Sequence, residues 1–397
     1  MDLTSGRTFS VTRYEKQNSF SSLHSNIKCD ILILGGGISG ALAAHSLVKL
    51  GLDCVVVDKR EIGMGSTCAS TSMLLYELDD PIVKLGEKIG IQKADRIYKV
   101  CTEAVYHLEE TASEISLKKF QRRKSLYFTG SLADKEMMNE EYLIRKKLGF
   151  EVSFLTADEL MQKFRLAAEA AILSECGAQT DAYLFTHALL EFNRHKMCGV
   201  FSNTTIVNLD FQQNKIVALT KEGNTITAKH VIHATGYESQ EYLPPGLVAL
   251  RSTYVTCGKK HPDATDFGSE AVYWNSANPY LYIRGADDMI MVGGEDEDFY
   301  NPQKRDELLE VKERTLLKKF HELFPSLPLK PEYSWCGTFG DTLDGMPYID
   351  TYGDKRNHFM LGFGGNGIVF SHIAAEILSY KVQGKPHSLT SYFSFER

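Results

Sequence analysis

The sequence predicts an α/β fold in which a discontinuous dinucleotide-binding domain is joined to a second, α+β domain with an antiparallel sheet. Three observations lead to this prediction: a β–turn–α–β unit near residue 30, a glycine-rich segment near residue 365, and a stretch of short strands between them. A chain of 397 residues is long enough for two or three structural units around a large core.

The β–turn–α–β unit occupies residues 30–60. Residues 31–34 form an apolar run of strand length, residues 35–40 read GGGISG, and apolar residues then recur at helical spacing. A second apolar run, residues 54–57, is followed by Asp58. Glycines at the first, third and sixth positions of the turn allow a tight turn, a close approach of a pyrophosphate and close packing of helix on strand. The unit therefore predicts a Rossmann-type dinucleotide site.

Within this unit, the helix N-terminus offers free N–H groups to the pyrophosphate, and Asp58 accepts hydrogen bonds from a ribose. The motif is shared by NAD and FAD sites and does not choose between them. The residues predicted to contact the dinucleotide are Gly35, Gly37, Ile38, Ser39, Gly40, Asp58, Lys59 and Arg60.

The segment after this unit, EIGMGSTCASTSMLLYELDDP (61–81), combines glycine with a cluster of Ser and Thr. Here the sequence resembles the flavoprotein family of D-amino-acid oxidase, glycine oxidase and sarcosine oxidase. In that family such a segment wraps the pyrophosphate and then runs beneath the isoalloxazine ring. A Ser/Thr cluster also caps helices, and both roles are compatible. The resemblance implies bound FAD, without a covalent link, and contacts from Gly65, Ser66, Thr67, Ser70, Thr71, Ser72, Met73 and Leu74.

Three further stretches carry the same resemblance. NTTIVNL (203–209) and KHVIHATGYES (229–239) are similar to the strands that hold the adenosine, and residues 335–378 are similar to the closing module with its Asp-Gly-x-Pro and Gly-Gly-x-Gly turns. The resemblance implies that the glycine-rich turn and the last helix lie against the pyrimidine edge of the flavin. The residues implied to contact the adenosine are Ile206, Ala234, Thr235 and Gly236. Those implied to contact the flavin are Gly364, Gly365, Asn366, Gly367 and Ile368.

The motifs at both ends of the chain imply a cofactor domain built from separate segments. We expect it to comprise residues 28–85, 150–240 and 336–397, with 86–149 and 241–335 forming the substrate domain. In the second of these substrate segments, YLYIR-GADD-MIMVGG (280–294) is a predicted β-hairpin.

Candidate substrate groups lie on this hairpin and close to it. Alternation in a strand places Tyr280, Tyr282 and Arg284 on one face, where Arg284 can grip a carboxylate bidentately. An ion pair of Arg284 with Asp287 or Glu295 is an equally good interpretation. Tyr254 and Trp274 are candidates for the pocket wall or for the core. The residues expected to act on substrate are Arg284, Tyr254, Tyr282 and Asn366.

The sequence departs from its relatives in the closing module. Glycine oxidase and its kin have an arginine before Asp-Gly-x-Pro that clamps the substrate carboxylate, whereas this chain has Phe339, with Asp341 close by. This leaves open a substrate without a carboxylate. Sarcosine oxidases attach their flavin through a cysteine in the same module; Cys336 is about one residue out of register.

The predicted function is that of an FAD-dependent oxidase or dehydrogenase, which oxidises a C–N bond of an amine or amino acid by hydride transfer to flavin N5. The substrates considered are D-amino acids, glycine, N-methyl and cyclic imino acids, and the acceptor is O2 or another compound. An FAD enzyme acting on a hydroxy acid or alcohol, and a flavin protein without small-molecule turnover, remain alternatives.

The composition limits the other function classes. A net charge of −7 disfavours nucleic-acid binding. Eight scattered cysteines without a C-x-x-C pair argue against metal sites and disulfides, and favour the reducing cytoplasm. No transmembrane segment is expected, because Lys49 and Asp53 interrupt the apolar stretch 31–57.

Overall fold

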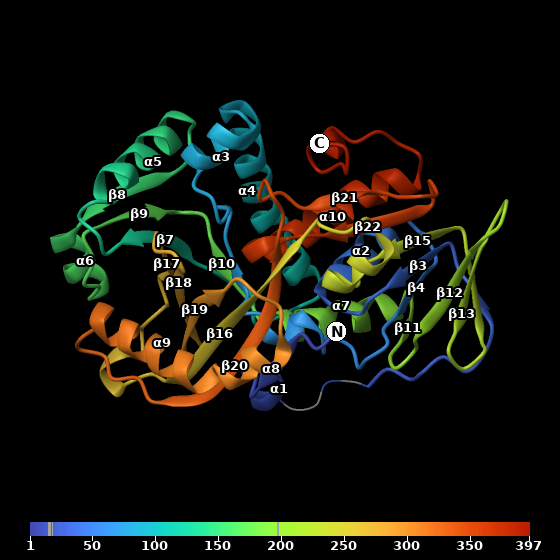
Figure 1. Ribbon diagram of the computed structural model, residues 1–397, viewed down its shortest axis with the longest axis horizontal. Helices are drawn as coiled ribbons and strands as arrows, with labels where there is room; N and C mark the ends of the chain where they lie inside the picture. Colours follow the sequence, from blue (N-terminus) through green and yellow to red (C-terminus); the bar gives the residue numbers. More distant parts are fainter. Residues whose placement is uncertain (15–16, 18, 197) are drawn as a thin grey trace.

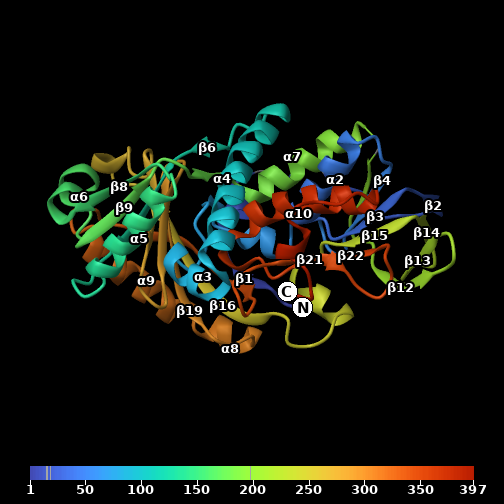
Figure 2. The same ribbon diagram turned by 90° about the horizontal axis from the view of Figure 1, so that it is seen from above.

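A computed structural model describes residues 1–14, 17, 19–196 and 198–397. Figure 1 shows two halves side by side: a large sheet with α5, α6 and α9 in one, and a smaller sheet with α2 and α10 in the other. In the view from above, α4 (Ile91–Glu114) runs between the two halves (Figure 2). Within the described part of the chain, no helix combines the length and apolar character needed to cross a membrane.

The smaller half is built on a six-stranded sheet. Its strands in spatial order are β11 (Cys198–Phe201), β4 (Cys54–Val57), β3 (Ile31–Leu34), β15 (His230–His233), β22 (Asn357–Leu361) and β21 (Tyr348–Thr351). The first five are parallel and β21 is antiparallel. Because both faces of this sheet are covered, its central strands are apolar throughout.

The two faces of this sheet carry different layers. Ile31 and Ile33 point into a core shared with the helices α2 (Ile38–Lys49), α7 (Ala182–Arg194), α10 (Gly367–Val382) and α4. Leu32 and Leu34, on the other face, pack against a four-stranded sheet. That sheet consists of β12 (Ile206–Phe211), β13 (Ile216–Thr220), β14 (Thr225–Ala228) and β2 (Ile27–Lys28).

The larger half is a nine-stranded mixed sheet. Its order is β1 (Thr4–Gly6), β20 (Pro331–Asp341), β16 (Ala249–Lys259), β19 (Met289–Glu297), β18 (Leu281–Ala286), β17 (Ala271–Asn275), β7 (Lys124–Thr129), β9 (Ala170–Ser174) and β8 (Val152–Thr156). All neighbours are antiparallel except β17 and β7. The predicted hairpin is confirmed as β18–β19. The α-helices not yet placed are α1 (Phe9–Arg13), α3 (Ile82–Ile89), α5 (Lys135–Lys147), α6 (Ala157–Phe164), α8 (Pro302–Glu307) and α9 (Leu309–Leu323).

The strand pairing departs from the expected domain boundaries at two places. β8 and β9, inside the expected cofactor segment 150–240, pair within the nine-stranded sheet. Helix α4, inside the expected substrate segment 86–149, shares its buried face with the core of the parallel sheet. Periodicity along the sequence identifies an apolar face but not the sheet that receives it, so order along the chain assigned both segments to the neighbouring domain.

A small three-stranded sheet links the two halves. It pairs β5 (Met73–Leu74) with β10 (Ala178–Gln179), which in turn pairs with β6 (Gln121–Arg122). The segment that the resemblance places beneath a flavin is therefore held in a fixed register.

Candidate active site

A cavity of about 480 Å³ is lined by residues from both halves. It reaches from the carboxyl ends of β3 and β4 to the nine-stranded sheet, and the segment 65–79 contributes to its lining. In open α/β sheets, ligands bind outside the carboxyl ends of the strands. The cavity is therefore the candidate site, and the predicted residues can be tested against its lining.

The glycine turn after β3 forms one end of the cavity. Gly35 has φ +109°, and a side chain at Gly40 would clash with the carbonyl oxygen of Gly35, so helix α2 can start close beneath the turn only with glycine there. The first turn of α2 carries no acidic residue and no side-chain cap. Its N–H groups and partial positive charge are thus available to a phosphate.

Two hydroxyl groups next to this helix start also suit a pyrophosphate. The Ser66 Oγ is buried without a hydrogen-bond partner, although Ser66 lines the cavity. The Thr67 Oγ1 accepts the N–H of Ile38 at 3.1 Å. A buried polar atom without a partner indicates a missing ligand or water, so these residues fit a dinucleotide.

Asp58 lies where the motif predicts, at the end of β4. Its carboxylate accepts the N–H groups of Gly36 and Arg60, both at 2.8 Å, and burial raises its pKa. Lys59 and Arg60 line the cavity too, but their charged ends bind Glu238, with Nζ and Nη2 at 2.9 Å and 2.8 Å from its Oε1. Burial alone would raise the pKa of Glu238; hydrogen bonds, first those from Arg60, lower it to about 2.

The residues that the resemblance implies for the adenosine also lie at the cavity. Ile206, at the start of β12, and Ala234, Thr235 and Gly236, after β15, all line the cavity. Thr204 and Thr205 line it as well and were not singled out in the sequence.

The Ser/Thr-rich segment reaches the cavity and also supports the start of a helix. Gly65, Ser66, Thr67, Ser70, Thr71, Ser72 and Met73 line the cavity. At the same time, the Ser72 Oγ accepts the N–H of Ala182 at 2.9 Å and so holds the start of α7. Gly40 and Leu74 are absent from the lining; Leu74 is fully buried, and its neighbour Leu75 faces the cavity instead.

The closing module forms the opposite wall. Gly364, Gly365, Asn366, Gly367 and Ile368 all line the cavity at the N-terminus of α10, which has no acidic residue in its first turn. The N–H of Gly365 donates to Asp79 Oδ2 at 3.1 Å. The Asn366 Nδ2 donates to the carbonyl oxygens of Leu75 and Glu77, at 3.3 Å and 2.6 Å. The two ends of the chain thus enclose the same cavity.

Aromatic residues line the end of the cavity that the nine-stranded sheet provides. They are Trp274, Tyr280, Tyr282 and Phe339, and we call this part, together with Leu75, Glu77, Leu78, Asp79, Thr253 and Thr338, the substrate end. The ring of Tyr282 lies across Gly293, where any side chain would collide with it. Its hydroxyl is 3.3 Å from Thr253 Oγ1.

Three residues singled out in the sequence do not reach this lining. Arg284 shares a strand face with Tyr282, as predicted, but lies two residues further along and is 4% exposed. Burial lowers the pKa of its guanidinium, and the charge of Asp181 partly offsets this. Tyr254 is fully buried in the core under α9, since Thr253 takes the cavity side of β16. Cys336 is fully buried, with its Sγ 3.1 Å from Ser5 Oγ, so it does not face the cofactor cavity.

The electrostatics of the substrate end are acidic. Asp79 is exposed to the cavity, and Asp296 and Asp341 lie behind it; burial and then neighbouring charges, Asp79 among them, raise their pKa values to about 7 and about 6. The nearby guanidinium of Arg251 is bound by Asp298 and Asp341, both at 2.8 Å. Among the described lining residues, the basic ones are Lys59 and Arg60, at the adenosine end.

These features agree with comparisons to known proteins. A model of the family "FAD dependent oxidoreductase" matches residues 30–381. The chain is 24% identical to gamma-glutamylputrescine oxidoreductase of Escherichia coli K12, over 93% of this chain and 87% of that protein. Its fold is similar to L-proline dehydrogenase of P. horikoshii (TM-score 0.77, 18% identity, 93% and 97% covered) and to glycine oxidase of Geobacillus kaustophilus (TM-score 0.75, 18% identity, 93% and 99% covered).

The family match covers most of the chain, and the glycine turn, the Ser/Thr segment and the closing module surround one cavity that fits FAD. The chain therefore belongs to the FAD dependent oxidoreductase family and is an FAD-dependent enzyme.

Proposed function

We propose that this enzyme oxidises the C–N bond of an amine whose remaining part carries a positive charge rather than a carboxylate. The observation that carries this proposal is the acidity of the substrate end. Asp79 is exposed to the cavity and interacts with Asp296 and Asp341, whereas the carboxylate of Glu77 is buried and paired with Arg145. A carboxylate there would meet acids without a free cation to hold it, which is unfavourable at short range. Phe339, at the position where an arginine is expected, agrees with this.

The aromatic walls support the same substrate class. Faces of Trp and Tyr attract ammonium groups within about 6 Å, with about 0.5–2 kcal/mol per contact. Trp274, Tyr280 and Tyr282 are three such side chains on one cavity. An alkyl diamine matches this combination, because its chain lies on apolar surface while its far ammonium meets rings and carboxylates.

The reaction itself needs little acid–base machinery. FAD, when bound, supplies the acceptor for the hydride. The chain contributes position: the substrate end holds the carbon next to nitrogen, and the α10 N-terminus with Gly365, Asn366 and Gly367 provides the positive potential that favours electron uptake in this family of sites.

An amino acid is the second candidate. The hydroxyls of Thr253 and Tyr282, 3.3 Å apart at the substrate end, can donate to a carboxylate without an arginine. Glycine oxidase and L-proline dehydrogenase, by their names, act on such compounds.

A matched series of compounds separates the two candidates. The holoenzyme is mixed anaerobically with 1,4-diaminobutane, butylamine, 4-aminobutanoate, glycine, sarcosine and proline, and bleaching of the flavin band is followed. We expect the diamine to reduce the flavin most efficiently and 4-aminobutanoate least. Faster reduction by 4-aminobutanoate or an α-amino acid would overturn the cationic class. Readmitting air then distinguishes an oxidase from a dehydrogenase by the rate of reoxidation.

A further inference from the structure

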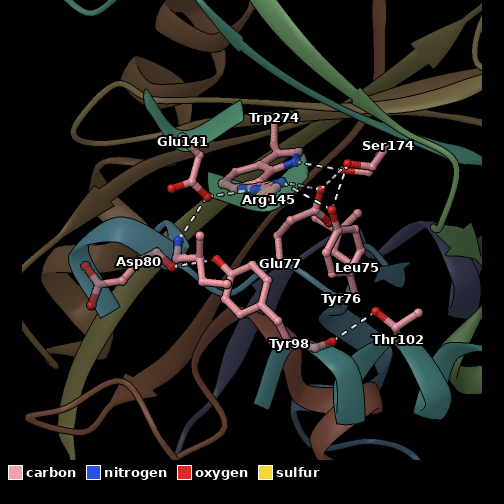
Figure 3. A network of polar contacts seen from close by, with 12 residues as sticks. Leu75, Tyr76, Glu77, Asp80, Tyr98, Thr102, Glu141, Arg145, Ser174 and Trp274 are labelled. Atoms are coloured by element: carbon pink, nitrogen blue, oxygen red, sulfur yellow. Dashed lines mark hydrogen bonds and ion pairs between the residues drawn. The ribbon is translucent and has the colours of Figure 1, made fainter. Parts of the chain in front are cut away.

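A buried group of three charged side chains lies directly behind the substrate end (Figure 3). Arg145 on α5 is fully buried, as is Glu77, and Glu141 is 1% exposed. The guanidinium binds Glu77 Oε1 through Nη1 at 3.0 Å and Glu141 Oε1 through Nε at 2.7 Å. The rings of Tyr76, Tyr98 and Tyr127 surround it, each within 5.8 Å of Cζ.

Glu77 is the acceptor on which this group converges. Besides Arg145, the Ser174 Oγ donates to its Oε1 at 3.1 Å. A further bond comes from Ser125, whose Oγ in turn accepts the indole N–H of Trp274 at 3.0 Å. Trp274 belongs to the aromatic wall, so the group is connected to one side of the substrate end.

Glu77 also fixes the floor of the cavity. Its carbonyl oxygen accepts from Asn366 in the closing module, while its side chain is held by α5, β7 and β9 of the other half. Leu75, Leu78 and Asp79, on either side of it, line the cavity. The short segment 75–79 is thus attached from both halves at one residue.

Glu141 extends the group to helix α3. Its two carboxylate oxygens accept the N–H groups of Ile82 and Val83, at 2.9 Å and 3.1 Å. These are the first residues of α3, where a helix favours negative charge. Arg145 therefore holds the chain at two points. One is Glu77, within the segment 75–79, and the other is the start of α3, which Arg145 reaches through Glu141.

Burial makes this arrangement sensitive to the loss of one member. Desolvation raises the pKa of Glu77, and the charge of Arg145 counteracts it. Removing one partner of a buried pair leaves an uncompensated charge and is strongly destabilising, whereas replacing both by apolar side chains is often tolerated. The effect of the ion pair on folding stability can therefore be separated by experiment from its effect on the position of the segment 75–79.

We propose that the Arg145–Glu77 ion pair is a positioning device of the active site, which sets how the segment 75–79 and Trp274 lie against the flavin and substrate. Arg145 and Glu77 act through residues that line the cavity. The part of the proposal that concerns the position of the flavin rests on family membership alone. The part that concerns Asp79 and an amine substrate rests on the proposed function.

The test compares Arg145→Met, the double variant Arg145→Met/Glu77→Met, and the control Lys381→Met. Lys381 pairs with Asp350 near the end of α10 remote from the cavity, both about one-sixth exposed, so its loss reports on an ion pair without a role in the site. The measurements are the thermal midpoint, the FAD dissociation constant, the flavin absorption band and the flavin midpoint potential, none of which needs a substrate.

We expect Arg145→Met to lower the thermal midpoint and to weaken FAD binding at least tenfold, with an altered flavin band. The double variant regains part of the thermal stability, because Glu141 then keeps only its hydrogen bonds to the start of α3. It keeps at least fivefold weaker FAD binding and a shifted potential, and Lys381→Met changes only the thermal midpoint. Glu77→Gln, which keeps the hydrogen bonds of the serines, replaces Arg145→Met should that variant not fold, with the same flavin changes expected.

Recovery of FAD binding, band and potential together with stability in the double variant would overturn the proposal, as would a normal flavin in every folded variant. The KM for the best amine is then measured for Arg145→Lys. A raised KM with unchanged FAD binding, absorption band and midpoint potential supports the role of the ion pair in placing Asp79 against the amine, and an unchanged KM contradicts it. If no amine reduces the flavin of the unaltered enzyme, the proposed function fails while the flavin measurements still decide the role of the ion pair.

Discussion

At the scale of single residues, the charge at the substrate end is set by a few carboxylates around one paired arginine. Asp79 is exposed to the cavity and accepts the amide of Gly365, while Asp341 lies two residues after Phe339 on β20. The guanidinium of Arg251 is occupied by Asp298 and Asp341 and is not free to hold a carboxylate. The proposed selectivity for a cation rests on this local excess of acids.

Asp79→Asn should therefore raise the KM for a cationic amine. A charge-assisted hydrogen bond contributes about 1.5–3 kcal/mol, which corresponds to a roughly 10- to 100-fold change. The flavin spectrum should stay unchanged. Asp80→Asn is the matched control, because Asp80 lies next to it but binds Lys88 at an exposed site. Equal effects of the two substitutions would remove Asp79 from the substrate site.

The pKa values of Asp296 and Asp341, about 7 and about 6, predict a pH dependence. Both carboxyls are largely neutral at pH 5 and largely charged at pH 8, so the KM for a diamine should fall as the pH rises between these values. Asp296→Asn should flatten the upper part of this profile. A profile identical in the variant would show that Asp296 does not act on the substrate.

The same raised pKa values predict that the folding stability falls as the pH rises, whereas amine binding improves. A carboxyl that binds its proton more tightly in the folded than in the unfolded state contributes stability below its unfolded pKa, and that contribution is lost as pH rises through the folded pKa. The gain in amine binding near pH 7 thus accompanies a loss of folding stability from the same two groups.

At the scale of elements, the antiparallel strands β18 and β19 determine which side chains reach the cavity. Tyr282 and Arg284 share a face as alternation predicts, but the cavity ends before Arg284, which is buried instead. On β16 the alternating pattern of the sequence fits Tyr254 or Thr253 equally, and pairing with β19 shifts between Ser252 and Tyr254. A single-residue offset decides which side chain meets the substrate.

Gly293→Ala on β19 tests the position of Tyr282. A methyl group there would collide with the tyrosine ring, which must leave the cavity wall, so we expect a several-fold higher KM with FAD binding retained. Gly130→Ala, at a site with open space around its Cα, serves as control. An unchanged KM in Gly293→Ala would mean that Tyr282 does not contact the substrate.

At the scale of the whole molecule, the sequence predicted the elements that obey local rules and missed those that depend on long-range contacts. The turn at Gly35–Gly40 and the segment Gly364–Ile368 have distinctive patterns, and nearly all of their predicted residues line the cavity. Glu77 and Arg145 lie 68 positions apart, and neither belongs to a recognisable sequence motif, so the sequence does not predict their ion pair. The strands β8 and β9 were misplaced for the same reason.

Because segments from both halves line the cavity, removal of bound FAD should destabilise the whole chain. A ligand at a hundredfold excess over its dissociation constant stabilises the folded state by about 2.7 kcal/mol, which for a chain of this length is a thermal midpoint shift of about 3 °C. Scanning calorimetry of apo and FAD-saturated protein measures this shift. Equal midpoints would contradict a site that joins both halves of the molecule.

The parallel pairing of β3 with β15, and of β15 with β22, has a consequence for biosynthesis. The ribosome makes the glycine turn first, yet the wall at Gly364–Ile368 emerges more than three hundred residues later, which at about 5–20 residues per second is a delay on the order of tens of seconds. The nascent chain therefore cannot complete its flavin site during most of translation. Cofactor loading becomes one of the last events in the maturation of this enzyme.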